Sequence, residues 1–127
     1  MSRSQTNPKH KQTLGRWGES VASTHLEANG FTIVTRNWRC RIGEIDLVAH
    51  KEDTLHFCEV KTRRGTQHGT PEEAITPAKA KKLIATALFY IGHHDLDNTD
   101  WQIDLIAIQL DPKGKLLRCE HLPNILY

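Results

Sequence analysis

The sequence predicts a single α/β domain with a mixed central β-sheet flanked by helices, in the order α-β-β-β-α-β-β. An amphipathic helical pattern precedes three consecutive strand-like runs, and a second helical pattern separates these from two further strand-like runs. The length is the third observation, because 127 residues can form one substantial core but not two. Consecutive strands followed by a long helix before the next strand indicate both antiparallel and parallel neighbours.

The first helix is predicted from an apolar stripe at helical spacing that runs from Leu14 to Leu26. Gly30 follows as a natural C-terminal cap. Glu19 lies at the edge of the stripe, beside its apolar positions. By spacing alone, its side chain either reaches inward to a site or covers the helix surface.

The chain before this helix is basic and contains no acidic residue. We predict that residues 1–13 are a disordered tail that adds nonspecific attraction to phosphates. Residues 14–127 are then the single folded domain.

The first strand is predicted at 31–34, and residues 37–41 are predicted to be a loop or a distorted strand end. Trp38 lies in this second segment. A tryptophan there could stack on a nucleic-acid base. A loop tryptophan is more often a local packing anchor, and we favour that role.

The apolar runs 43–48 and 57–61 flank a polar turn and predict a β-hairpin. If the turn is centred between Glu52 and Asp53, residues whose numbers sum to 105 face each other. Asp46 then lies opposite Glu59, where the Cβ atoms of facing residues are about 4.5–5.5 Å apart and like charges repel. Strand alternation places Lys61 on the same face as Glu59.

Two facing carboxylates within apolar strands destabilise the fold unless they are paired or bound to a cation. Mg²⁺ binds through one or two carboxylates and keeps waters for substrate phosphates, so Asp46 and Glu59 are candidate metal ligands. Lys61 could orient or deprotonate the attacking water, or neutralise charge on the phosphate. The alternative is a ladder of cross-strand ion pairs, Glu44 with Lys61 and Asp46 with an arginine. We favour the site.

The segment Thr70–Glu73 has the pattern of a capping box. Thr76 is the expected N-cap of a second helix at 77–91, which starts with a proline. Strands are predicted at 101–110 and, at the sheet edge, at 115–121. The apolar positions of the second helix are Ala80, Leu83, Ile84, Ala87, Leu88 and Ile91.

Asp104 interrupts the apolar run of the penultimate strand. It could pair with a nearby arginine, cap a buried backbone group, or lie beside the candidate site. Structural pairing is the interpretation we favour.

Basic residues gather around the acidic positions, although the net charge is only +2. Such a distribution suits a polyanion whose phosphates approach a metal, with ordinary solvated surface as the alternative. Arg63 is the strongest candidate, because alternation places it on the face of Glu59 and Lys61. The predicted nucleic-acid-binding residues are Arg36, Arg39, Arg41, Arg63 and Lys79.

Composition limits the class of protein. No apolar run approaches the roughly 18 residues of a membrane span, and the N-terminus has no apolar signal segment. The three cysteines are scattered, which fits neither a disulfide framework nor a zinc site. We therefore expect a cytoplasmic protein with reduced thiols and no membrane partner.

Taken together, the motifs resemble those of known families. Asp46 followed by Glu59-x-Lys61 resembles the active-site signature of the restriction-endonuclease-like, or PD-(D/E)xK, superfamily. From about Leu14 onward the chain more closely resembles the bacterial YraN family. The motifs that carry this resemblance are Gly18-Glu19, Asn37-Trp38-Arg39, Gly43-Glu44-Ile45-Asp46-Leu47, Glu59-Val60-Lys61-Thr62-Arg63 and Thr76-Pro77-Ala78-Lys79.

The resemblance implies a restriction-endonuclease-like fold and a site related to that of Holliday junction resolvases. Asp46 and Glu59 would hold Mg²⁺ or Mn²⁺, Lys61 would be the catalytic lysine, and Glu19 would be an additional acid. One departure from the superfamily signature is Ile45, which stands where a proline often precedes the aspartate.

The sequence thus predicts a metal-dependent nuclease that hydrolyses phosphodiester bonds of DNA, with branched or damaged DNA as the preferred substrate by resemblance. One alternative is a nucleic-acid-binding module that uses the same fold without turnover. Another is a partner-docking domain without enzymatic activity. Many members of the broader superfamily work as dimers, which makes a homodimer one candidate assembly.

Overall fold

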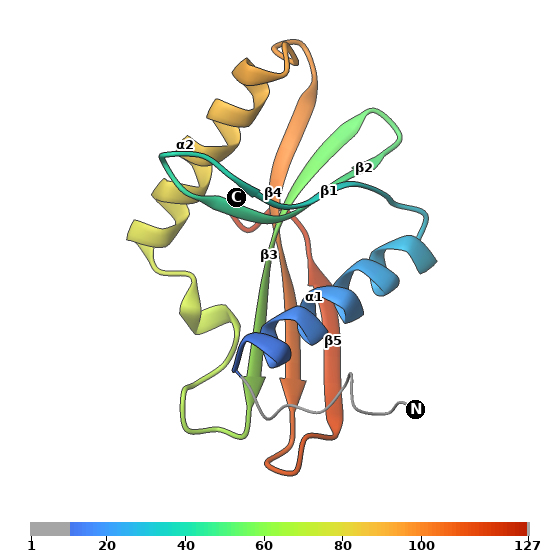
Figure 1. The fold of residues 1–127 in the computed structure, drawn as a ribbon, viewed down its shortest axis with the longest axis vertical. Helices are drawn as coiled ribbons and strands as arrows, with labels where there is room; N and C mark the ends of the chain where they lie inside the picture. Colours follow the sequence, from blue (N-terminus) through green and yellow to red (C-terminus); the bar gives the residue numbers. More distant parts are fainter. Residues whose placement is uncertain (1–10, 127) are drawn as a thin grey trace.

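The computed structural model describes residues 11–126, and Figure 1 shows their arrangement. The predicted order of helices and strands is confirmed, with one additional 3₁₀ helix before the second α-helix. Residues 1–10 of the predicted tail lie outside the described residues. The elements are α1 (Lys11–Ala28), β1 (Thr32–Arg39), β2 (Glu44–Lys51), β3 (Thr54–Arg64), η2 (Glu72–Ala74), α2 (Pro77–His93), β4 (Asp100–Leu110) and β5 (Leu116–Leu122).

The five strands form one mixed sheet in the order β1-β2-β3-β4-β5. Strands β3 and β4 are parallel, and the other neighbouring pairs are antiparallel. Parallel neighbours need a long crossover connection, which α2 supplies between β3 and β4 (Figure 1). No helix among residues 11–126 is both long and apolar enough to cross a bilayer.

The local signals for the helix ends are confirmed. The main chain turns at Gly30, whose φ of +90° favours glycine, directly after α1. Thr76 accepts a hydrogen bond from the N–H of Lys79 at the start of α2, and Pro77 is the first helical residue. The capping box also forms, because the Thr70 N–H donates to Glu73 Oε1 and the Glu73 N–H donates to Thr70 Oγ1.

The register of the β2–β3 hairpin follows the predicted sum of 105 from Lys51↔Thr54 to Leu47↔Cys58. Beyond Leu47, β2 continues to pair with β1 only, so Asp46 and Glu59 lie just past the end of the β2–β3 ladder. The prediction that Asp46 faces Glu59 within the ladder is therefore wrong, and Glu44 does not face Lys61 either. The two strands separate at the position where the acidic residues lie.

Other expectations need correction. The first strand, predicted at 31–34, extends to Arg39, so residues 37–39 are the distorted strand end that the sequence allowed and not a loop; Asn37 there has a φ of +52°. Leu88 was expected on the apolar face of α2, but it is 53% exposed. Trp38 is a packing anchor, as favoured, because its ring lies 5.0 Å from that of Tyr90 at nearly right angles.

Two hydrophobic clusters fill the space between the sheet and the helices. One contains α2 residues and the other contains α1 residues, so each helix packs against the sheet through its own cluster. Ile103 contributes to the α2 cluster and Ile106 to the α1 cluster, and both are almost fully buried. This packing holds the helices that carry Glu19 and Lys79 against the sheet.

Gly18 permits the close approach of α1 to β3, since a Cβ at this position would collide with Thr62 Oγ1. We expect Gly18→Ala to lower the free energy of unfolding by about 1–3 kcal/mol, the usual range for an overpacked site. A loss of stability would be informative, because alanine favours the helix over glycine by roughly 1 kcal/mol, so helix propensity alone predicts a gain. Urea denaturation measures the effect, and the double variant Gly18→Ala/Thr62→Ala should recover most of the loss. A Gly18→Ala protein as stable as wild type would contradict this account of the contact.

Candidate active site

A cleft of about 1000 Å³ lies beside the point where β2 and β3 separate. Its walls come from α1, the end of β1 and the turn after it, β2, β3, the loop that follows β3, and α2. Most of the predicted site residues line this one cleft. They are Glu19, Arg39, Asp46, Glu59, Lys61, Arg63 and Lys79.

Asp46 is held by the backbone of the neighbouring strand. The Val60 N–H donates a hydrogen bond of 2.8 Å to Asp46 Oδ2. Burial, and after it the charge of Glu59, raise the pKa of Asp46 to about 7, although the Val60 hydrogen bond opposes the shift. Without a cation, the ionised form of Asp46 is therefore much less favoured at neutral pH than that of an ordinary aspartate, whose pKa is 3.8.

Glu59 is buried, with 4% of its side chain exposed, and it contacts two lysines. Lys61 Nζ and Lys79 Nζ each lie 3.3 Å from Glu59 Oε2. The expected proximity of Lys61 and Glu59 on one face of β3 is thus present. Lys79 was expected to bind nucleic acid, and its contact with Glu59 is a partnership that sequence reasoning missed.

Glu19 turns toward the cleft rather than covering the outer surface of α1. Burial raises the pKa of Glu19, a hydrogen bond with Asn37 lowers it, and the charge of Glu44 raises it. Arg16 and Arg36 lower it more weakly. Glu19 thus adds a third carboxylate to Asp46 and Glu59, from a different element.

The alternative of a simple ion-pair ladder does not describe the remaining charges. Glu44 lies 3.6 Å from Arg39 of β1, to which it is paired across the strands, instead of contacting Lys61. Within residues 11–126, Asp46 forms no ion pair with an arginine, and its hydrogen bond goes to a backbone N–H.

The five predicted phosphate-binding residues divide into two groups. Arg39, Arg63 and Lys79 line the cleft. Arg36 instead donates from Nη1 to Ser23 Oγ at 2.9 Å, and the guanidinium of Arg41 lies 5.5 Å from the ring centre of Phe89. Neither of these two arginines is among the cleft residues.

Arg63, in the cleft wall, has a buried hydrogen-bond donor without a partner among the described residues. Its Nε is buried and has no hydrogen-bond partner among the described residues, while its Nη1 donates to the Thr62 carbonyl at 3.3 Å. A buried donor without a partner costs about 1–3 kcal/mol, which an oxygen ligand would offset. The loop after β3 adds Gln67 and His68 to the wall. In the sequence, the place of Gln67 and His68 in the cleft is indicated only by the position of their loop, directly after Arg63 and Arg64.

The donor set fits a hard divalent cation. Asp46 and Glu59 supply carboxylate oxygens, and Glu19 supplies a further acid on another wall. A cation would offset both the burial and the repulsion by Glu59 that raise the pKa of Asp46. Lys61, Lys79 and Arg63 supply positive charge beside these acids, as binding of a phosphate ester requires.

Comparison with known proteins identifies relatives along most of the chain. Residues 18–108 match the model of the uncharacterised protein family UPF0102. A UPF0102 protein of Chloroflexus aurantiacus is 50% identical over 91% of this chain and 93% of its own length. Those of Renibacterium salmoninarum and Roseiflexus castenholzii are 46% and 43% identical, over 91% and 87% of this chain and 97% and 90% of their own lengths. The description of this family assigns no reaction to its members.

Proposed function

The chain belongs to the UPF0102 family, which confirms the resemblance to YraN proteins, and we propose that it is a metal-dependent nuclease acting on DNA. One observation carries the proposal. Glu19, Asp46 and Glu59 come from three different elements and line one cleft, in which Lys61 contacts Glu59. Three acidic side chains that share one cleft and bind nothing destabilise a fold, whereas phosphodiester hydrolysis needs a cation held by carboxylates beside a positively charged side chain.

Each residue has a role in this proposal. Asp46 and Glu59 would hold Mg²⁺ or Mn²⁺, with Glu19 as an assisting acid. The bound cation supplies Lewis-acid stabilisation of the phosphate and lowers the pKa of a bound water. Lys61 donates hydrogen bonds that orient the attacking water or neutralise the phosphoryl oxygens. Arg63, Arg39 and Lys79 hold the backbone phosphates at the cleft wall.

The preferred substrate would be branched or damaged DNA, in line with the resemblance to Holliday junction resolvases. The test is an assay with Mg²⁺ and Mn²⁺ on single-stranded, duplex, flap and four-way-junction DNA and on structured RNA. Metal-dependent cleavage of a junction or flap in preference to duplex is the expected result. Exclusive cleavage of RNA would overturn the substrate class.

A second candidate function is a nucleic-acid-binding module without turnover. The two lysines on Glu59 Oε2 favour it, because they compensate this carboxylate without any cation. A binding module predicts salt-dependent DNA affinity that Asp46→Asn leaves unchanged, with no cleavage at any metal concentration. A nuclease predicts cleavage that is lost in this variant.

A further inference from the structure

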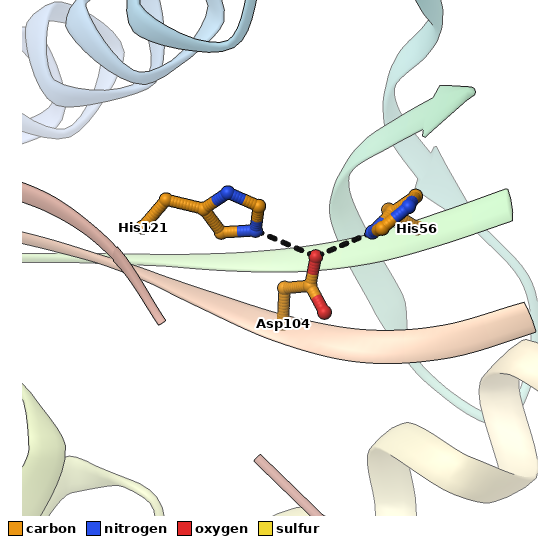
Figure 2. Close-up of side chains that lie close together, drawn as sticks. All are labelled: His56, Asp104 and His121. Carbon is orange, nitrogen blue, oxygen red and sulfur yellow. Dashed lines mark hydrogen bonds and ion pairs between the residues drawn. The ribbon is translucent and has the colours of Figure 1, made fainter. Parts of the chain in front are cut away.

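A second cluster of metal-ligating side chains lies outside the cleft. His56, Asp104 and His121 come from the neighbouring strands β3, β4 and β5, and none of them lines the cleft described above. Asp104 is fully buried, His56 is 9% exposed, and His121 is half-buried. Figure 2 shows the two imidazoles on either side of the Asp104 carboxylate, each directed at the same oxygen.

The distances among the three ligand atoms are partly shorter and partly longer than those between the ligands of one metal ion. Asp104 Oδ2 lies 2.6 Å from His56 Nδ1 and 2.7 Å from His121 Nε2, and the three ligand atoms all lie within 4.8 Å of one another. A tetrahedral Zn²⁺ holds imidazole nitrogen and carboxylate oxygen at about 2.0–2.2 Å, which separates any two ligands by about 3.3 Å. To reach that spacing, the two distances from Asp104 Oδ2 would lengthen by about 0.6–0.7 Å, and the two imidazole nitrogens would take positions about 3.3 Å apart.

The carboxylate is oriented by groups that a metal would not displace. Asp104 Oδ1 accepts hydrogen bonds from Gln102 Nε2 at 2.9 Å and from the Asn124 N–H at 2.8 Å. These two donors fix the plane of the carboxylate and leave Oδ2 for the two imidazoles. Such outer partners are typical of metal ligands, whose orientation they set.

The cluster is also accessible from solvent. A small cleft of about 550 Å³ is lined by both His56 and His121. Cys119, two positions before His121 on β5, lines it as well. The cleft provides an entry path and room for a water as the fourth ligand, which closed structural sites lack.

We propose that His56, Asp104 and His121 form a transition-metal site that takes Zn²⁺. Two imidazoles and one carboxylate suit Zn²⁺ and related ions, whereas Mg²⁺ prefers oxygen ligands alone. The site is therefore chemically distinct from the carboxylate-lined cleft. The ion would connect β3 and β4 to the edge strand β5, and so stabilise the sheet against local opening of that edge.

Calorimetric titration with Zn²⁺ in the presence of excess Mg²⁺ tests the proposal, with the full chain as the sample. We expect one Zn²⁺ per chain and a rise of roughly 5 °C or more in the unfolding temperature. The informative variant is His121→Gln, which retains an amide donor for Asp104 but removes the imidazole ligand. Because glutamine can still donate to Asp104, we expect this change to leave the circular dichroism spectrum unaltered, although the His121 side chain is only 17% exposed. We expect it to weaken Zn²⁺ binding at least tenfold.

A matched control is the double variant His93→Gln/His94→Gln, which removes the adjacent histidines at the end of α2. It should bind Zn²⁺ as wild type does. Tetrahedral Co²⁺ absorption that is present in wild type and absent in His121→Gln would support the assigned ligands. Undetectable Zn²⁺ binding by wild type, or equal binding by wild type and His121→Gln, would overturn the proposal and leave a buried hydrogen-bonded network.

Discussion

Replacing Lys61 by alanine is expected to reduce metal-dependent cleavage by about 10²–10⁴-fold, the usual contribution of a positioned proton donor or acceptor. Cation binding should survive this change, because Lys61 is not a ligand. Asp46→Asn should instead lose both cleavage and cation binding, since it removes the negative charge of a metal ligand. Single-turnover cleavage rates and Mn²⁺ binding, measured on the same protein samples, separate the two effects.

The cleft offers a matched control for Lys61. Lys79 Nζ lies at the same 3.3 Å from Glu59 Oε2, but it comes from α2 instead of β3. If Lys61 served only to compensate the charge of Glu59, Lys61→Ala and Lys79→Ala would reduce cleavage equally. We expect the Lys61 variant to be slower by at least tenfold, and equal rates would contradict a catalytic role for Lys61.

The second large effect concerns the stability of the metal-free protein. Asp46 has a folded-state pKa of about 7, raised mainly by burial, against an ordinary value of 3.8. Between these two values the unfolded chain has lost a proton that the folded chain retains. Stability therefore falls as pH rises through this window and levels off above pH 7. The pKa difference sets an upper limit of about 4 kcal/mol on the loss.

Asp46→Asn removes this titration while keeping an oxygen that can accept from the Val60 N–H. In the presence of EDTA, we expect the variant to be more stable than wild type by about 1–3 kcal/mol at pH 8 and nearly equal at pH 4. Urea denaturation at the two pH values provides the comparison. A stability difference that does not change with pH would contradict the assignment.

Addition of Mg²⁺ at pH 8 extends this experiment. The cation should stabilise wild type, because it binds the folded state only, and it should leave Asp46→Asn unchanged. This readout does not depend on the identity of the nucleic-acid substrate. It therefore tests the metal site separately from the nuclease reaction.

Local chemistry explains why much of the fold could be predicted from sequence. A two-residue turn after Lys51 fixes the hairpin register, and Thr76 with Pro77 fixes the start of α2. Both signals involve residues within a few positions of one another. The acid, acid and lysine of the site were predictable for the same reason, because they lie on the two strands of one hairpin.

The parts that could not be predicted depend on non-local packing. The contact of Lys79 with Glu59 requires the crossover of α2 over the sheet, which sequence spacing does not determine. Asp104 was expected to form a structural pair, and it does, but with histidines of β3 and β5 instead of an arginine. Its partners follow from the strand order, which places β4 between β3 and β5.

The most direct test of the central claim is the Mg²⁺ dependence of DNA cleavage by wild type and Asp46→Asn, purified identically and assayed on a four-way junction. The proposed function predicts cleavage by wild type that requires Mg²⁺ or Mn²⁺, stops with EDTA and is absent in Asp46→Asn, although both proteins bind the junction. No cleavage by wild type on any DNA substrate, with both proteins binding DNA equally, would contradict the nuclease and favour the binding module.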